Sequence, residues 1–409
     1  RMTAPRFNPQ TSRRQRLGRV WSALFLGAIL IAILALGALL YDIIDGAFGL
    51  VAIENRVDPA SLAIEGVPLE DLSKEQLTAI LAQHVSAGLL RRLEHDQPFE
   101  ERDRANVYAL VIERVVEPQI VKTWSLTASL TRRAAIEAEV AAKYPGAKLE
   151  FRAWINPTFI QTPQSSKPEI AGVRTAILGS LWTIALTILI AFPVGVGAAI
   201  YLEEYASDTA LNRVIQTNIN NLAGVPSIIY GMLGLAIFVR GLEPFTSGTL
   251  FGVADPTTAN GRTVLSAGLT LALLILPLII INAQEAIKAV PASLREASYG
   301  LGATRWQTIW HHVLPNALPG ILTGTILAIS RAIGETAPLV VVGASAFVAL
   351  DPSGPFSKFT TLPIQIYQWT TRPQDQYRNL AAAASLMLLV LLLSLNAAAI
   401  LLRNRYSKK

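Results

Sequence analysis

Six apolar stretches stand out along the chain, separated by polar segments of very unequal length. Each approaches the roughly 20 residues that an α-helix needs to cross the hydrocarbon core of a membrane. The predicted spans are residues 21–41, 175–201, 222–239, 264–281, 318–341 and 381–402. The pattern therefore predicts an all-α polytopic membrane protein with six transmembrane helices.

Basic residues beside the outermost spans predict the orientation. They are Arg6, Arg13, Arg14, Arg16 and Arg19 before the first span, and Arg403, Arg405, Lys408 and Lys409 after the last. Short segments rich in Lys and Arg stay on the cytoplasmic side. Both termini are therefore expected in the cytoplasm, which agrees with an even number of spans. The same count places residues 282–316 inside and residues 42–174 outside.

The first apolar stretch also has one feature of a secretory signal peptide, because residues 13–19 form a charged region directly before it. The apolar run is longer than the hydrophobic region of such a peptide, and no clear Ala-x-Ala site follows it. A retained membrane anchor is the favoured interpretation.

Residues 42–174 are too many and too charged to be a simple connection between spans. Ser73 and Gln76 have the spacing of a helix capping box. The apolar residues that follow at helical spacing are Leu77, Ile80, Leu81, Val85 and Leu89. Further predicted elements are helices over 99–116 and 129–144, and a strand over 148–155. A small mixed α/β domain is expected.

Composition narrows the function. Only 16% of the 409 residues are charged, below the quarter or so typical of soluble domains. The net charge of +6 comes from basic residues beside apolar spans, so membrane flanks explain it better than nucleic-acid binding. The chain has no cysteine, and His84 and His95 lack metal-ligand spacing. No metal site is expected.

Catalytic motifs are also missing from the sequence. It contains no Gly-x-x-x-x-Gly-Lys-Ser/Thr loop for nucleotide phosphates, no His-Glu-x-x-His and no Gly-x-Ser-x-Gly. We therefore expect no catalytic residue in this chain.

The segment Glu296-Ala297-Ser298-Tyr299-Gly300-Leu301-Gly302, with Leu314-Pro315 after it, resembles the cytoplasmic EAA loop of ABC-importer permeases. In that family the loop is a short helix that docks on the ATP-hydrolysing subunit. The resemblance implies a coupling role for Glu296, Ala297, Ser298, Gly302, Leu314 and Pro315. Ser298 replaces the usual second alanine, and His312 stands where isoleucine is usual. We expect Glu296 to begin the helix and Gly302 to end or bend it.

Residues from 170 onward resemble the permease subunits of phosphate ABC transporters, of the PstA type. Besides the EAA-like loop, the resemblance rests on residues 198–206, 224–231, 331–339 and 362–367. The segment 331–339, Arg-Ala-Ile-Gly-Glu-Thr-Ala-Pro-Leu, is the most specific to phosphate permeases. Residues 42–174 lie outside the resemblance, which gives them no function.

The resemblance implies the type I importer permease fold in a bacterial inner membrane. Residues 1–41 would be a cytoplasmic tail and anchor, 42–174 a periplasmic insert, and 175–409 the permease core with the loop 282–316. The implied partners are an ATPase dimer, a second permease subunit, a periplasmic phosphate-binding protein and the bilayer. ATP and magnesium would bind the ATPase, and this chain would bind no cofactor.

Arg331 and Glu335 are four residues apart in the fifth predicted span, so they share one helix face. A charge at the bilayer centre costs about 2.5–3.5 kcal/mol on insertion scales, so it is expected to face protein or water. The planar guanidinium of Arg331 fits phosphate oxygens. Glu335 would hold it in place or weaken the site so that the anion leaves. The alternative is a structural ion pair that locks two helices.

Pro226 is predicted to interrupt the third span, because it frees the carbonyl four residues before it. Ser227 and Tyr230 would then line a cavity. Equally, Gly224 and Gly231 would serve only close helix packing. Glu203 and Glu204, at the end of the second span, are interpreted as solvated surface residues.

Two other functions compete with phosphate import. One is a permease for another oxyanion, such as phosphonate or sulfate. The other is an intramembrane enzyme with Glu335 as acid or base, which would require a second catalytic group at the same depth. Whether the permease pairs with itself or with a related subunit stays open, although the resemblance favours a related subunit.

Overall fold

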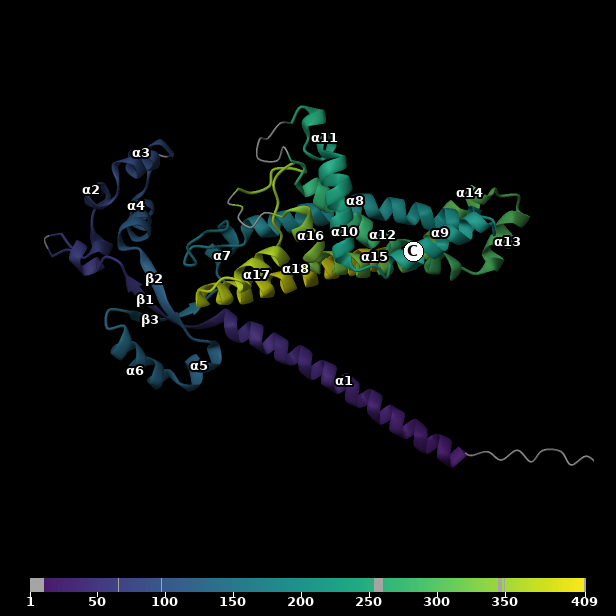
Figure 1. Ribbon diagram of the computed structural model, residues 1–409, viewed down its shortest axis with the longest axis horizontal. Coiled ribbons are helices and arrows are strands. Elements are labelled where there is room, and N and C mark those ends of the chain that lie inside the picture. The colour runs from purple at the N-terminus through teal and green to yellow at the C-terminus, as the bar shows by residue number, and fades with distance from the viewer. Residues whose placement is uncertain are drawn as a thin grey trace, which may run out of the picture.

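The computed structural model describes residues 11–64, 66–96, 98–253, 260–344, 348 and 350–407. Arg6, Lys408 and Lys409 of the predicted basic flanks lie outside the described residues. The protein has a helical bundle with the EAA-like segment at one end and a small α/β unit at the other (Figure 1).

Five of the described helices are long and apolar enough to cross a membrane. They are α1 (Thr11–Ala47), α8 (Arg174–Ile200), α12 (Val264–Lys288), α15 (Leu314–Gly334) and α18 (Asp375–Ser407). A bent pair forms the sixth candidate. It joins α9 (Ala210–Leu222) to α10 (Ser227–Gly234) and its π-helical extension η6 (Leu235–Gly241) at 108°. The predicted polytopic all-α membrane architecture is confirmed.

Two predicted spans are broken in the structure. The interruption of the third span at Pro226 was predicted and is confirmed, whereas the break in the fifth span was not predicted. The third, over 222–239, joins the last residue of α9 to α10 across a break directly before Ser227. The fifth, over 318–341, ends at Gly334 and is followed by a separate helix, α16 (Ala337–Val342). Pro226 and Pro338 account for both breaks, because proline has no N–H to donate and its ring clashes with the preceding turn.

Side-chain contacts show how the helices run. Thr187 Oγ1 of α8 donates to the carbonyl of Gly268 in α12 at 3.2 Å. Gln284 Nε2, further along α12, donates to Glu203 Oε1, just beyond α8, at 2.9 Å. From the first contact to the second, the residue numbers increase along both helices, so α8 and α12 are parallel. The bent pair α9–α10 therefore carries the chain back across the bundle between them.

The remaining spans alternate in direction. Gly324 of α15 lies against Asn282 of α12, and Gly320 lies against Ala286, which makes these two helices antiparallel. Asn379 near the start of α18 donates to the carbonyl of Gly46 near the end of α1 at 2.7 Å. The start of α1 and the end of α18 therefore point toward the end of the bundle that holds α13 (Ala292–Gly300) (Figure 1).

The insert is a small mixed α/β unit, as expected. Strand β1 (Phe48–Asn55) is central and pairs antiparallel with β2 (Pro118–Thr123) and β3 (Lys148–Ala153). The predicted capping box of Ser73 and Gln76 is confirmed at the start of α2 (Lys74–His84). The other helices of the insert are α3 (Ala87–Asp96), α4 (Arg104–Val111) with its π-helical extension η4 (Ile112–Val116), α5 (Leu126–Thr131), α6 (Arg133–Lys143) and α7 (Pro157–Gln161).

Several predicted boundaries in the insert were wrong. The helix predicted over 99–116 begins at Arg104, where the Asp103 side chain accepts from the backbone N–H of Asn106 and caps the helix. The helix predicted over 129–144 is two helices that meet at Arg132. The strand predicted over 148–155 ends at Ala153.

The insert shares a hydrophobic core with the adjoining end of the bundle. From the insert, the sheet contributes Val51 and Ile120, the residue after β3 is Trp154, and α7 contributes Phe159. The bundle contributes Trp369 of α17 (Leu362–Thr370) with Tyr377 and Leu380 of α18. The rings of Phe159 and Trp369 are 6.1 Å apart. Because these side chains are buried, the insert is packed onto the bundle and not merely tethered to it.

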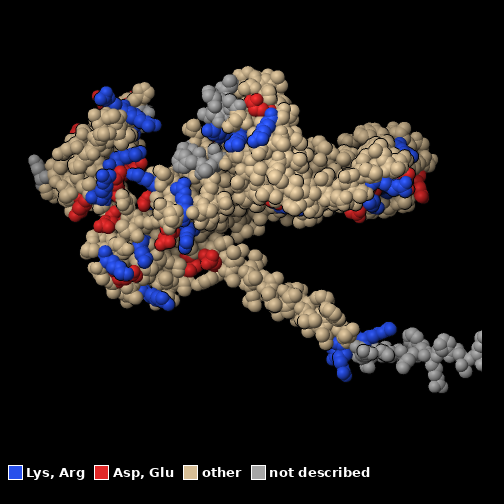
Figure 2. Space-filling view, in the orientation of Figure 1, with Lys and Arg blue, Asp and Glu red and all other residues tan. Residues whose placement is uncertain are grey.

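Charges concentrate at the two ends of the molecule. Figure 2 shows Lys, Arg, Asp and Glu over the insert, around α13 and in a smaller group near α11 (Glu243–Thr246), whereas the visible face of the bundle between α11 and α13 carries few. An apolar belt between two charged ends is the surface expected of a membrane-spanning bundle.

Candidate functional site

The structure brings together two of the sequence segments that predicted a path. Gly231 of α10 lies against the Pro338 region of α16, so that a Cβ atom placed on Gly231 would be 2.6 Å from the Pro338 Cα. This close approach needs a residue without a side chain. The segments 224–231 and 331–339 are therefore neighbours, although about 100 residues separate them in sequence.

Arg331 lies near the end of α15, with Glu335 just beyond the helix. Its Nε is 3.4 Å from Glu335 Oε1, and the side chains are 43% and 17% exposed. The two Nη groups of Arg331 have no hydrogen-bond partner among the described residues. The ion pair that a structural role requires is therefore present. It uses only the Nε of Arg331 and leaves both Nη groups open among the described residues.

Arg331 sits well inside the bundle along its length. The next two residues, Ala332 and Ile333, line a small cavity with Ser180 and Thr183 of α8. Thr183 is nine residues into α8, which at 1.5 Å per residue is about 14 Å from the first residue of that helix. The 27 residues of α8 are about 40 Å long, so Arg331 lies about a third of the way along the bundle from the end that carries the insert.

Pro226 and Tyr230 act together at the break before α10. Pro226 directly precedes α10, and α9 has ended at Leu222, so the predicted interruption at Pro226 is confirmed. The hydroxyl of Tyr230 donates to the carbonyl of Leu222 at 2.7 Å, and the Tyr230 side chain is buried. Ser227 is half-buried at the first position of α10. Whether Ser227 and Tyr230 line a path stays a prediction.

The EAA-like segment forms the short helix α13, but Glu296 lies in its middle and does not begin it. The helix starts at Ala292 after Pro291. Gly302 follows the helix with a φ of +84°, in the left-handed region that favours glycine. Its N–H donates to the carbonyl of Tyr299 at 2.9 Å, which closes the helix end.

The remaining coupling candidates divide into buried and exposed residues. Ser298 is buried, and its hydroxyl is 2.8 Å from that of Thr308 in the next helix, α14 (Arg305–Thr308). Leu314 and Pro315 form the first turn of α15, after the π-helix η8 (Ile309–Val313). His312 is exposed and Val313 is buried, so Val313 provides the apolar contact at this point.

One face of this loop is apolar and uncovered. Glu296 and Ala297 are exposed, and Leu301 is 91% exposed. The exposed rings of Trp306 and Trp310 stack with centroids 5.5 Å apart. Exposed apolar groups gathered in this way are typical of a surface that another protein covers.

Sequence reasoning missed a set of charged residues beside the loop. Glu203 and Glu204, interpreted as solvated, lie in the π-helix η5 (Tyr201–Tyr205) and are only 17% and 7% exposed. Glu204 pairs with Arg295 of α13 at 2.7 Å, and Glu203 lies 3.4 Å from Lys288 of α12. The sequence does contain a signal for these ion pairs. Glu203 and Glu204 closely follow one predicted span, and Lys288 and Arg295 lie in the predicted loop 282–316.

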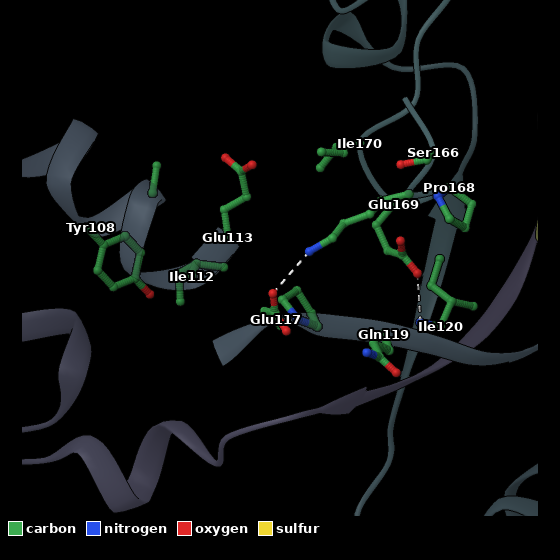
Figure 3. A pocket seen from close by; sticks show the side chains of 13 residues that line it. Tyr108, Ile112, Glu113, Glu117, Gln119, Ile120, Ser166, Pro168, Glu169 and Ile170 are labelled. Carbon is green, nitrogen blue, oxygen red and sulfur yellow. Dashed lines mark hydrogen bonds and ion pairs between the residues drawn. The ribbon is translucent and has the colours of Figure 1, made fainter. Parts of the chain in front are cut away.

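A second hollow lies in the insert. This groove has a volume of about 650 Å³. It lies between the end of α4 with η4, the start of β2 and the segment 166–170 (Figure 3). Its charges are already paired: Glu117 accepts from Arg56 and Lys167, and Glu169 accepts from the Ile120 N–H. These bonds, that from Arg56 first, lower the pKa of Glu117 from its ordinary value. None of the predicted site residues lines the groove.

The described residues bring together no group of three His, Asp or Glu side chains that could hold a metal ion. The site therefore consists of two parts: the charged pair within the bundle and the exposed loop at its end. An apolar bundle with a charged pair partway along its length, whose Arg331 is exposed, and with an uncovered loop at one end, is the arrangement expected of the membrane subunit of a transport system.

The comparison with protein families agrees with this class. Residues 191–408 match the family described as binding-protein-dependent transport system inner membrane component. The chain belongs to this family and is a multi-pass inner membrane protein. The predicted permease fold is thereby confirmed.

Named relatives are similar over more than half of the chain. The chain is 35% identical to phosphate transport system permease protein PstA 1 of Mycobacterium tuberculosis (strain ATCC 25618 / H37Rv), over 57% of this chain and 70% of the relative. It is 32% identical to the probable ABC transporter permease protein YqgI of Bacillus subtilis (strain 168), over 61% and 84%. It is 35% identical to phosphate transport system permease protein PstA of Yersinia pestis, over 61% and 77%.

Proposed function

We propose that this chain is a permease subunit of an ATP-driven importer for inorganic phosphate. The observation that carries the proposal is Arg331, a permanent cation within the length of the bundle, with its Nη groups open among the described residues. The relatives named phosphate transport system permeases support phosphate as the cargo. Arg331 would bind phosphate oxygens through two parallel hydrogen bonds.

Glu335 keeps this anion site weak enough to release its cargo. Its carboxylate lies 3.4 Å from Arg331 and is mostly buried. A nearby negative charge opposes an incoming anion, so that phosphate binds without being trapped. Conduction requires this balance between entry and release.

The exposed loop receives the ATPase. Glu296, Ala297 and the apolar surface of Leu301, Trp306 and Trp310 would be covered by a partner subunit that binds ATP and magnesium. Two such ATPase subunits would open and close the path by alternating access. This chain itself would bind no cofactor and catalyse no reaction.

A second permease subunit completes the path. Arg331 is 43% exposed on the bundle, and a charged group at that depth requires protein or water beside it. A related subunit would cover it, and relatives named PstA and PstC both occur among the similar proteins. Both termini would be cytoplasmic, and the insert would face a periplasmic phosphate-binding protein.

Radiolabelled phosphate uptake tests the function. A strain that lacks this chain should lose high-affinity uptake and regain it with the wild-type chain, and excess sulfate or phosphonate should not compete. Competition by sulfate or phosphonate instead would make the chain a permease for that oxyanion. Normal uptake in the deleted strain would contradict the proposal.

A further inference from the structure

Arg295 joins three elements at the inner end of the bundle. Its Nε and Nη2 donate to Glu204 Oε1 at 3.1 and 2.7 Å. Its Nη2 also donates to the carbonyl of Ile287 at 2.9 Å, and its Nη1 donates to that of Val290 at 2.7 Å. One side chain of α13 thus holds the last turn of α12 and the acidic segment that continues α8.

The pair is shielded from water. Glu204 is 7% exposed and Arg295 is 19% exposed. The strength of a charge-assisted hydrogen bond rises as water is excluded, and a buried charge that loses its partner is strongly unfavourable. This pair therefore resists separation far more than the exposed ion pairs of the insert do.

The neighbouring residue, Glu203, extends the connection to α9. Glu203 Oε1 accepts from Gln284 Nε2 at 2.9 Å, and Lys288 Nζ lies 3.4 Å away. Gln284 also exchanges hydrogen bonds with Gln216 of α9, at 2.8 and 3.1 Å. The inner ends of α8, α9 and α12 are consequently fastened to one another directly beside α13.

The opposite face of α13 is open. Glu296 and Ala297, which follow Arg295, are exposed, whereas Arg295 points into the bundle. A force applied to the exposed face of a short helix moves the spans only if the helix is rigidly attached to them. The contacts of Arg295 provide this attachment. They join α13 to the end of α12 and to the acidic segment that continues α8.

We propose that Arg295 and Glu204 are positioning residues that convert movement of the docked α13 into movement of α8 and α12. The inference rests on the proposed docking of an ATPase on α13, but it does not depend on which anion is transported. Without the pair, α13 would still bind the ATPase, and its movement would no longer reach the two spans together.

The test uses the complete complex in proteoliposomes with its periplasmic binding protein and phosphate. Three quantities are measured: ATPase subunit bound per permease, ATP hydrolysis with and without the binding protein, and phosphate taken up per ATP hydrolysed. Glu204→Gln should leave subunit binding and basal hydrolysis unchanged. Stimulation by the binding protein, and phosphate per ATP, should each fall roughly tenfold, within the range typical of coupling between sites.

Arg213→Ala is the matched control, because Arg213 is an exposed cation on α9 that lies 3.7 Å from the exposed Asp208. It should behave as wild type. Arg295→Lys keeps the charge but cannot serve Glu204 and two carbonyls at once, so it should be intermediate. A normal ratio of phosphate to ATP in Glu204→Gln would overturn the proposal. The proposal would also be overturned if Glu204→Gln and Arg295→Lys both lost the bound ATPase subunit, or were both missing from the membrane. The pair would then serve only folding.

A covalent bridge supplies an independent measurement. The chain has no cysteine, so the double substitution Glu204→Cys and Arg295→Cys gives two unique thiols. A short bis-maleimide should restore binding-protein-stimulated hydrolysis in this variant and not in either single variant. Failure of the bridged variant to recover, although cross-linked, would contradict the proposal. If wild type shows stimulated hydrolysis but no phosphate uptake, the proposed cargo fails while this inference stands.

Discussion

The hydroxyl of Tyr230 donates a hydrogen bond to the carbonyl of Leu222, and this carbonyl is the one that lies four residues before Pro226. In a continuous helix the carbonyl at this position would accept from the backbone N–H of residue 226, which proline lacks. The buried hydroxyl of Tyr230, from the next helix, and the N–H of Val225 at 3.1 Å donate to it instead. The 108° bend between α9 and α10 is thus closed by its own chain, without need of a partner subunit.

Tyr230→Phe should therefore destabilise the protein. The substitution removes the hydrogen bond of the buried Tyr230 hydroxyl, while the Leu222 carbonyl keeps the one from the Val225 N–H at 3.1 Å. The loss of one such bond costs about 0.5–1.5 kcal/mol. Thermal unfolding of the purified protein in detergent measures the effect. Tyr367→Phe is the control, because Tyr367 is exposed and should lose nothing. An unchanged melting temperature with strongly reduced uptake would instead assign Tyr230 to the path.

Gly302 should be sensitive to substitution for a backbone reason. Its φ of +84° lies where a side chain costs about 1–2 kcal/mol. No atom lies within 4 Å of a Cβ placed there, so the cost is conformational and not a clash. Gly302→Ala should weaken retention of the ATPase subunit on purification while membrane levels stay normal.

Gly300→Ala is a matched comparison for Gly302. Gly300 is the last residue of α13, and a Cβ there also meets open space. Alanine suits a helical position better than glycine does, so this variant should retain the ATPase fully. Equal loss in both variants would show that the surface itself, and not the helix end, is sensitive.

The spans were predictable because about 20 apolar residues in a row leave few alternatives to a membrane helix. The break at Pro226 was also predictable, because proline frees a carbonyl four residues before it. The break before Pro338 was missed, because the apolar run continues through it and hydropathy does not register a missing N–H. Strand β1 was missed for a related reason: Phe48–Asn55 follows α1 directly, and its buried apolar residues lack the alternation of a half-exposed strand.

The candidate site was predictable only in part. Arg331 could be found because a charge within an apolar run is conspicuous. Glu204 and Arg295 are 91 residues apart, and each alone resembles an ordinary polar residue beside a membrane. Their pairing depends on the parallel packing of α8 and α12, which no local pattern encodes.

The groove of the insert predicts a pH dependence. The Arg56 guanidinium, and then Lys167, lower the pKa of Glu117 from its ordinary value of 4.5. A carboxyl group whose folded pKa is depressed contributes stability above its unfolded pKa and loses it as the pH falls through the folded pKa. The difference in melting temperature between wild type and Glu117→Gln should be largest near neutral pH and should shrink below pH 4.5. The exposed pair of Arg133 and Glu137 offers a control, since Glu137→Gln should change little at any pH.

The orientation of the insert can be measured with thiols. Ala138 of α6 and Ser207 after η5 are both exposed, and they lie in the insert and at the inner end of α8. In intact cells, a membrane-impermeant maleimide that passes the outer membrane should label Ala138→Cys. It should label Ser207→Cys only after the inner membrane is opened. The reverse pattern would place the insert in the cytoplasm.

Arg331 is the residue on which the proposed transport depends most. Arg331→Gln should abolish phosphate uptake although the complex assembles, because it removes the one charged side chain of α15. Arg331→Lys should also fail substantially, since an ammonium cannot reproduce two parallel hydrogen bonds to one anion. Uptake, membrane levels and ATPase binding would be measured together.

The ion pair with Glu335 allows the two roles of Arg331 to be separated. If the pair is purely structural, exchanging the charges by Arg331→Glu with Glu335→Arg should restore uptake, because opposite charges would again face each other across a single contact of 3.4 Å. If Arg331 binds the anion, the exchange moves the cation off the helix to the extended residue beyond it, and uptake should stay lost. Recovery in the double variant would therefore assign Arg331 to helix packing. Continued loss, with normal assembly, would leave phosphate binding as the reason for a charge at this depth.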